Sequence, residues 1–160
     1  MRGIRGDVVA STSGGGIDIT GIQGTLRAET SGGSIDIGDV SGDLTARTSG
    51  GGVDIRGAGG RVEAESSGGS VNVAFASGNA RGGVLSTSGG GIRAEVDPTV
   101  ALSIDASASG GGVNADVPVT VRGRISRDAL RGDLNGGGAL LRMSTSGGGV
   151  RIASTRASNR

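Results

Sequence analysis

The stretch Ser13-Gly14-Gly15-Gly16-Ile17-Asp18-Ile19-Thr20 returns six more times along the chain in closely similar form. Its serine stands at positions 13, 31, 49, 67, 88, 109 and 146. The spacing is constant over the first four phrases and slightly longer over the next two, and the last gap is close to two periods. Self-similarity at a fixed period predicts a stack of structural repeats, so this order argues against a disordered glycine-rich linker.

Each repeat holds two short runs in which apolar and polar residues alternate, such as 26–30 and 35–37. Alternation with a period of two predicts strands, and no pattern with the helical period of 3.6 appears. One coil cannot bury its apolar face alone, but stacked coils form a continuous core. We therefore predict an all-β chain, a single-domain parallel β-solenoid (β-helix) of about eight coils with 18–21 residues per coil.

The repeat assigns the inward side chains and the corners. The predicted core ladders are Ile17, Ile19, Leu26, Ile35, Ile37, Leu44, Val53, Ile55, Val62, Val71 and Val73. The predicted corners are Gly14, Gly15, Gly32, Gly33, Gly50, Gly51, Gly68, Gly69, Gly89, Gly90, Gly110, Gly111, Gly147 and Gly148. Glycine suits a sharp corner because it reaches positive φ at no steric cost, and it also lets the backbones of neighbouring coils approach.

Residues 1–153 form the predicted repeat domain, with regular coils over 3–74 and looser coils over 75–153. Phe75 is expected to plug the core where the first regular coils end. Asp97-Pro98 and Val117-Pro118 interrupt the repeat, because proline cannot donate in a strand ladder, and residues 122–133 are the least regular segment. The repeat resumes near Leu140 and closes with residues 150–152, ahead of a polar tail over 154–160.

Composition excludes several kinds of chemistry. The 160 residues include 36 glycines and one phenylalanine but no His, Cys, Trp, Tyr or Lys. Without His or Cys there is no ordinary general base near neutral pH, no thiolate nucleophile and no soft metal ligand. The absence of aromatic platforms for stacking bases or sugars excludes nucleic acid as an expected partner and disfavours carbohydrate. No apolar run is long enough to span a membrane.

The charge is unevenly distributed, although the net charge is only +1. Residues 1–116 carry 8 Arg and 13 acidic residues, whereas residues 117–160 carry 8 Arg and only Asp128 and Asp133. Such asymmetry suits either a solvated basic surface or attraction between the two ends of neighbouring copies.

Calcium is the metal alternative for the repeated phrase. The phrase approximates the glycine- and aspartate-rich repeat of calcium-binding β-rolls, but it occurs once per coil instead of twice. Asp18, Asp36 and Asp54 should form an outward like-charge ladder that cations could screen. Calcium needs six or more oxygen ligands, so we predict no specific metal site and no cofactor. A phosphate-binding loop is also not expected, because no helix and no lysine follows the glycines.

Other side chains recur at the coil period. Glu29, Arg47 and Glu65 alternate in sign along one outward row, as favourable cross-strand pairs do. Hydroxyl side chains also recur at the coil period, and alternation along the strand places them on the inward side with Leu and Ala, although an outward row could order water or ice. These residues are Thr12, Thr30, Thr48, Ser66 and Thr87.

Units of the form G-x-[LV]-x-A-x-[TS]-S-G-G-x-[IV]-x-[IV], followed by Leu134-Asn135-Gly136-Gly137-Gly138 and the closing stretch 145–152, resemble the bacterial DUF4097 family of adhesin-like repeats. The resemblance covers nearly the whole chain. It implies a β-solenoid, usually at the cell envelope, and it brings no catalytic residues.

We therefore expect a non-enzymatic structural or adhesive protein that is extracellular or at the cell envelope, and otherwise cytoplasmic. Both ends of the stack look uncapped, which favours head-to-tail homo-oligomers or filaments. The alternative is a binding module that recognises a glycan, protein or cation, such as a cell-surface or host ligand, along a repeated outer face. An enzyme on a solenoid scaffold is disfavoured, because the carboxylates are scattered one per coil.

Overall fold

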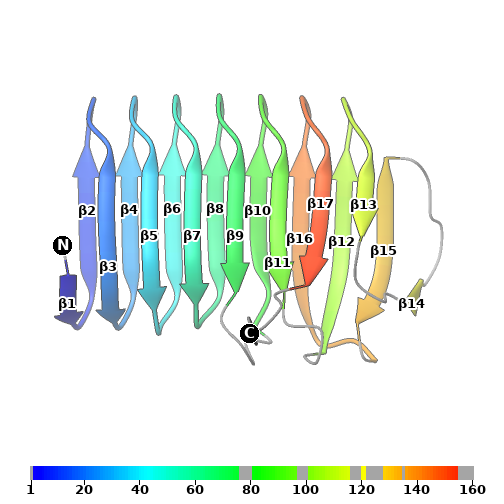
Figure 1. The fold of residues 1–160 in the computed structure, drawn as a ribbon, viewed down its shortest axis with the longest axis horizontal. Helices are drawn as coiled ribbons and strands as arrows, with labels where there is room; N and C mark the ends of the chain where they lie inside the picture. Colours follow the sequence, from blue (N-terminus) through cyan, green and yellow to red (C-terminus); the bar gives the residue numbers. More distant parts are fainter. Residues whose placement is uncertain are drawn as a thin grey trace, which may run out of the picture.

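The computed structural model describes residues 2–75, 81–96, 101–115, 120–121, 128–134 and 136–154. These residues form seventeen β-strands and no helix, arranged in two sheets whose strands are mostly parallel (Figure 1). The all-β prediction is confirmed, and the arrangement is consistent with a β-solenoid. Of the sequence features noted above, both proline dipeptides, residues 122–127 and the tail after Ser154 lie outside the described residues.

The nine-stranded sheet runs, in spatial order, through β2 (Val8–Thr12), β4 (Leu26–Thr30), β6 (Leu44–Thr48), β8 (Val62–Ser66), β10 (Gly83–Thr87), β16 (Ala139–Thr145), β12 (Leu102–Ala108), β15 (Ala129–Leu134) and β14 (Thr120–Val121). The eight-stranded sheet runs through β1 (Arg2–Arg5), β3 (Ile17–Gln23), β5 (Ile35–Val40), β7 (Val53–Ala58), β9 (Val71–Phe75), β11 (Ile92–Val96), β17 (Val150–Ser154) and β13 (Val113–Ala115).

The pairing register reproduces the sequence period in the first repeats. Leu26 lies beside Leu44, and Ile17 lies beside Ile35, so each residue pairs with its equivalent in the next repeat. Between β8 and β10 the step along the chain becomes longer, with Val62 beside Gly83. Each repeat therefore supplies one strand to each sheet, and identical positions stack on one another.

The core lies between the two sheets as one cluster. All eleven side chains of the expected ladders are buried in it, and Phe75 is buried at 3% exposure. Small and β-branched side chains predominate, because parallel strands that are packed closely on their inner faces favour them. The threonine and serine row is also buried from Thr30 onwards, as parity predicts.

The order of the last coils differs from their order along the chain. β16, the last strand of its sheet in sequence, lies between β10 and β12, and β17 lies between β11 and β13. Residues 150–152 therefore end the repeat along the chain but do not lie at the end of the sheet. Figure 1 shows the red and orange strands inside the row of green and yellow ones.

The stack is not parallel throughout. β15 pairs with β12 and with β14 in antiparallel fashion, so the irregular segment of the sequence ends in a strand that runs against the repeat.

Candidate functional site

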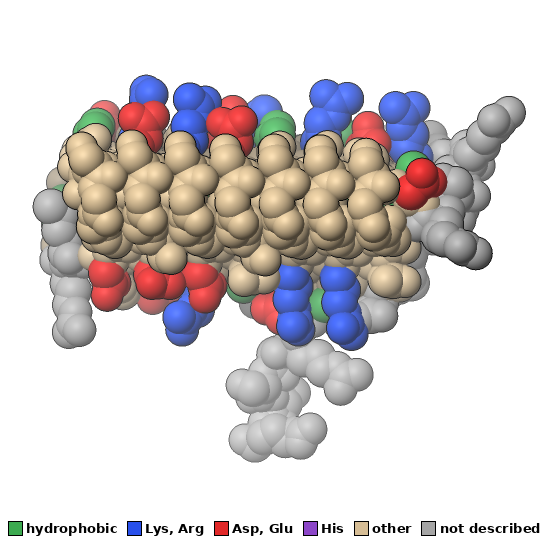
Figure 2. Space-filling view, turned by 90° about the horizontal axis from the view of Figure 1, so that it is seen from above, with side chains coloured by type: hydrophobic (Ala, Val, Ile, Leu, Met, Phe, Trp, Pro, Cys, Tyr) green, Lys and Arg blue, Asp and Glu red, His purple; other side chains and the backbone are tan. Residues whose placement is uncertain are grey.

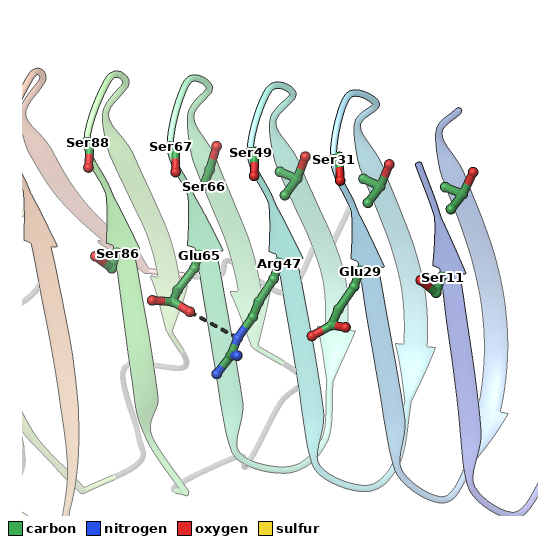
Figure 3. Close-up of a pocket in the computed structure, with 13 residues that line it drawn as sticks. Ser11, Glu29, Ser31, Arg47, Ser49, Glu65, Ser66, Ser67, Ser86 and Ser88 are labelled. Atoms are coloured by element: carbon green, nitrogen blue, oxygen red, sulfur yellow. Dashed lines mark ion pairs between the residues drawn. The ribbon is translucent and has the colours of Figure 1, made fainter. Parts of the chain in front are cut away.

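A shallow groove of about 400 Å³, which we call the serine groove, runs along the stack beside the Ser-Gly-Gly corners. Two rows of side chains line it (Figure 3). The strand row is Ser11, Glu29, Arg47, Glu65 and Ser86. The corner row is Ser31, Ser49, Ser67 and Ser88, the first residues of the repeated phrase.

The coil register creates both rows. Ser11, Glu29, Arg47 and Glu65 occupy the same position of successive strands, and from Glu29 onwards the residues on either side of them in the strand are buried. Equivalent residues in neighbouring parallel strands are about 4.8 Å apart, so the groove presents polar groups at that interval. The groove is charged in its middle and bears serine hydroxyls at both ends, and beyond the groove the strand row continues with Ser144 and Ser107.

A buried row of hydroxyls supports the groove from below. Thr48 Oγ1 donates to the carbonyl of Gly33 in the preceding coil at 2.8 Å, and it accepts the amide of Gly51 at 3.4 Å. The same pair of bonds is made by Thr30, Ser66, Thr87 and Thr145. The donated bond joins one corner to the preceding one, and the accepted amide bond lies within the hydroxyl's own corner, so together they fix the spacing of the exposed serines above them.

The corner glycines are required for a different reason than positive φ. None of the described glycines in the Ser-Gly-Gly phrases has positive φ; the positive-φ glycines include Gly3, Gly21 and Gly57 at the opposite turn. What matters at the corner is backbone approach: a Cβ on Gly33 would lie 2.3 Å from the carbonyl oxygen of Gly15. Glycine is therefore needed at this corner because the neighbouring backbones stack closely, and not because the chain adopts positive φ there.

The charges of the groove are paired near the surface. Arg47 Nε lies 3.0 Å from Glu65 Oε2, and Arg27 Nη2 lies 3.0 Å from Glu29 Oε1. These side chains are about half exposed, and such pairs contribute roughly 0.2–1 kcal/mol each. Their value lies in orienting carboxylates and a guanidinium along the groove more than in stabilising the fold.

The expected aspartate ladder exists on the opposite, eight-stranded sheet. Asp18, Asp36 and Asp54 are neighbours in register, and the same row continues through Asn72 to Arg93 and Arg151. On one long side of Figure 2, acidic side chains gather toward the N-terminal half and arginines toward the other half. Among the described residues no group of three or more His, Cys, Asp or Glu side chains is placed to hold a metal ion.

The N-terminal end of the stack has an open edge, formed by β1 and β2. Neither strand has a neighbour on its outer side among the described residues. Ala10 and Thr12 are partly exposed there, whereas their counterparts one coil further in, Ala28 and Thr30, are buried. Val9 is 75% exposed on the outer face of the same edge.

The far end differs from the N-terminal end. There the nine-stranded sheet finishes with antiparallel β15 and the two-residue β14, and the eight-stranded sheet finishes with the three-residue β13. Among the described residues, the two ends of the sheets therefore differ in strand direction.

No protein-family model matches the chain, and no curated protein or solved structure matches it significantly. The described residues contain no helix that is long and apolar enough to cross a membrane.

Sequence reasoning did not find the serine groove, although its signal was present. The serine that opens every phrase and the alternate residues of the preceding strand are both periodic. Only the fold shows that these two rows lie side by side.

Proposed function

We propose that this chain is a non-enzymatic structural β-solenoid whose copies associate end to end through the open edge at β1 and β2. In this proposal the described strands form coils of 18–21 residues, wound as a rod with about eight coils. The coil-to-coil register between equivalent positions supports the winding.

The proposed self-association rests on the backbone amides of edge strand β2 and on the direction in which they point. Val8 N–H donates to the carbonyl of Thr25 at 2.9 Å, toward β4. Because successive amides of a parallel strand point to opposite sides, the Val9 and Ser11 amides face the open edge. An edge of unpaired N–H and C=O groups is a template for another strand, and exposed Val9 adds an apolar contact beside it.

The occupant that fits this edge is a second copy of the same edge. Two N-terminal ends that meet about a two-fold axis pair their edge strands in antiparallel fashion and cover the partly exposed core residues of both first coils. The two ends differ, because the nine-stranded sheet finishes at the far end with antiparallel β15 and β14, so we favour a pair of rods that meet at like ends over the expected filament.

Proline substitution tests this proposal directly. Val9→Pro removes an amide that faces the edge, and proline is tolerated on edge strands when its nitrogen faces solvent. The matched control, Ala10→Pro, removes an amide that faces β4 instead. Sedimentation velocity over a concentration series should show association of the native chain and its loss in Val9→Pro, with the circular dichroism of Val9→Pro unchanged.

The control variant separates edge blocking from damage to the fold. Ala10→Pro should lower the unfolding temperature, since it breaks a bond between β2 and β4. A native chain that stays monomeric at every concentration contradicts the proposal. So does a Val9→Pro variant that folds and associates as the native chain does.

The serine groove supports a second candidate function, the binding of an extended polar ligand such as a glycan. Its hydroxyls and carboxylates repeat at the coil interval, and hydrogen bonds from such groups suit a polymer with a repeating unit. Ser49→Arg, in the middle of the corner row, should abolish binding on a panel of immobilised polysaccharides, whereas Ser146→Arg, outside the groove, should not. An equal effect of both variants, or no binding by the native chain, would count against it.

An adhesive role at the cell envelope belongs to the same proposal and rests on the resemblance to adhesin-like repeats. A rod that pairs through one end leaves both serine grooves exposed, and each could then face a cell-surface or host ligand. Fractionation of cells that produce the full-length protein would test the location, with envelope or extracellular fractions expected and the cytoplasm as the contrary result.

A further inference from the structure

The C-terminal coil, which we define as β16 and β17 (139–154), is the last in sequence but has a neighbouring coil on each side. β16 pairs with β10 on one side and with β12 on the other. β17 pairs with β11 and with β13 in the same way. A terminal segment therefore fills a slot between two earlier parts of the chain, as the strand positions in Figure 1 show.

This coil is as deeply buried as any in the stack. Leu141, Met143 and Ile152 are each 0% exposed, and Val150 is 1% exposed. Its removal would open the apolar interior of both flanking coils. The flanking coils therefore need the C-terminal coil to cover their apolar side chains, and the C-terminal coil needs them to bury its own.

The hydroxyl row shows that the slot is specific for this coil. Thr145 Oγ1 donates to the carbonyl of Gly90 at 2.6 Å, which continues the row from Thr87. The equivalent residue of β12 is Ala108, which lies beside Thr145 and has no hydroxyl. If β12 stacked directly on β10, the carbonyl of Gly90 would lose its side-chain donor, so Thr145 favours the inserted order.

Charge supports the same order. Asp105 of β12 lies 3.8 Å from Arg142 in the C-terminal coil and 3.5 Å from Arg131 in β15. Its side chain is 22% exposed, so these contacts are partly shielded from solvent. In a stack that followed chain order, Asp105 would instead face Val84, the residue beside Arg142 on β10.

The segment that leads into the C-terminal coil is rich in glycine and changes direction sharply. Gly136 and Gly137 have φ of 91° and 86°, values that favour glycine, and Gly138 follows them before β16 begins. Consecutive glycines can absorb a large change of backbone direction, so this segment can act as a hinge. The rest of the slot is formed by strands that precede the hinge in sequence.

We propose that the C-terminal coil can leave its own slot and fill the same slot of a second copy. An exchanged pair keeps every contact described above, since Thr145, Arg142 and the buried side chains meet identical partners. Only the backbone of the hinge changes. Exchange of identical elements is a low-cost route to dimers, and it joins copies through a surface separate from the open edge.

Disulfide trapping in the full chain tests the exchange. Ser86 and Ser144 are neighbours in register on the outer face of β10 and β16. Neighbouring strands are about 4.8 Å apart, which lies within the Cα separation of about 4.4–6.8 Å that a disulfide requires. Because the chain has no cysteine, Ser86→Cys and Ser144→Cys each introduce the only thiol of their copy.

The two single variants are unfolded together, refolded at high concentration and oxidised with glutathione disulfide. A covalent heterodimer linked through positions 86 and 144 is expected, and its yield should fall when refolding is performed at high dilution. The matched control mixes Glu65→Cys with Ser86→Cys, which are also neighbours in register but both precede the hinge. That mixture should yield no such heterodimer.

The exchange would be overturned if the first mixture gave no linked heterodimer at any concentration, or if the first and control mixtures gave equal yields. The experiment is repeated with Val9→Pro in both copies. The heterodimer should persist, because β10 and β16 are separated from the open edge by β4, β6 and β8, and its persistence separates exchange from the proposed edge association; its loss would count against the exchange.

Discussion

The hydroxyl of Thr145 donates a 2.6 Å hydrogen bond to the carbonyl of Gly90, 55 residues earlier in the chain. The corresponding bonds from Thr30, Thr48 and Ser66 span 15 residues, and that from Thr87 spans 18. The same hydrogen-bonding pattern therefore continues from β10 to β16, where neighbours in space are no longer neighbours along the chain. The row of hydroxyls holds neighbouring corners together whether or not their coils are consecutive.

Loss of one hydroxyl from this row should destabilise the fold. Thr48→Val keeps the shape of the side chain but leaves the Gly33 carbonyl and the Gly51 amide without their side-chain partner. A buried polar group left unpaired costs about 1–3 kcal/mol, so urea unfolding should show a loss of that size. Thr48→Ser is the control, because Ser66 makes the same bonds naturally. Equal stabilities of the two variants would contradict the role of the hydroxyl.

The second and third glycines of a phrase should respond differently to substitution. A Cβ on Gly51 would overlap the carbonyl oxygen of Gly33, and relieving this overlap would require the backbone of the neighbouring strand connection to move. Gly51→Ala should therefore reduce the free energy of unfolding by about 2 kcal/mol or more. Gly52→Ser meets its nearest atom at 3.1 Å, and serine already stands at the equivalent positions 34 and 70. Thermal unfolding should rank Gly51→Ala well below Gly52→Ser, and the reverse order would refute the steric argument.

The turn opposite the Ser-Gly-Gly corner has one residue in an unusual conformation. Asp39 has φ of 48°, and the equivalent residues of neighbouring coils, Gly21 and Gly57, also have positive φ. Asp39→Val should lose about 1–2 kcal/mol, because the left-handed region is unfavourable for residues with a Cβ and worst for β-branched ones. Asp39→Asn should be close to neutral, since asparagine tolerates this region. Chemical denaturation of both variants checks the prediction, and an unaffected Asp39→Val would contradict it.

The aspartate ladder should behave as a row of like charges and not as a metal site. Asp36 lies in register between Asp18 and Asp54. Asp36→Asn should raise the unfolding temperature slightly at low salt, and the difference should shrink as salt screens the charges. EDTA and calcium should each leave the unfolding temperature of the native chain unchanged. A clear stabilisation by calcium that Asp36→Asn abolishes would instead establish a cation site.

The regular part of the fold could be read from the sequence because its repeats are nearly identical. Alternation around Ile35 and Leu44 defines both inner rows, and a constant period leaves one register in which they stack. Parity alone also placed Thr48 and Ser66 inside.

The end of the stack could not be read in this way. The phrases at Ser109 and Ser146 are so similar that their local sequence does not order them in space. The order depends on long-range contacts, such as those of Asp105 with Arg131 and Arg142, which have no periodic signal. The antiparallel strand β15 was missed for the same reason, since it lies outside the repeat.

Hydrogen exchange at the edge strand β2 tests the proposed end-to-end association most directly. The Val9 and Ser11 amides face the open edge, while the Ala10 amide faces β4 and serves as an internal control. In a labelled sample followed by NMR, raising the protein concentration should slow exchange at Val9 and Ser11 and leave Ala10 protected throughout. Exchange at Val9 and Ser11 that stays fast while the copies associate would show that the open edge is not the contact.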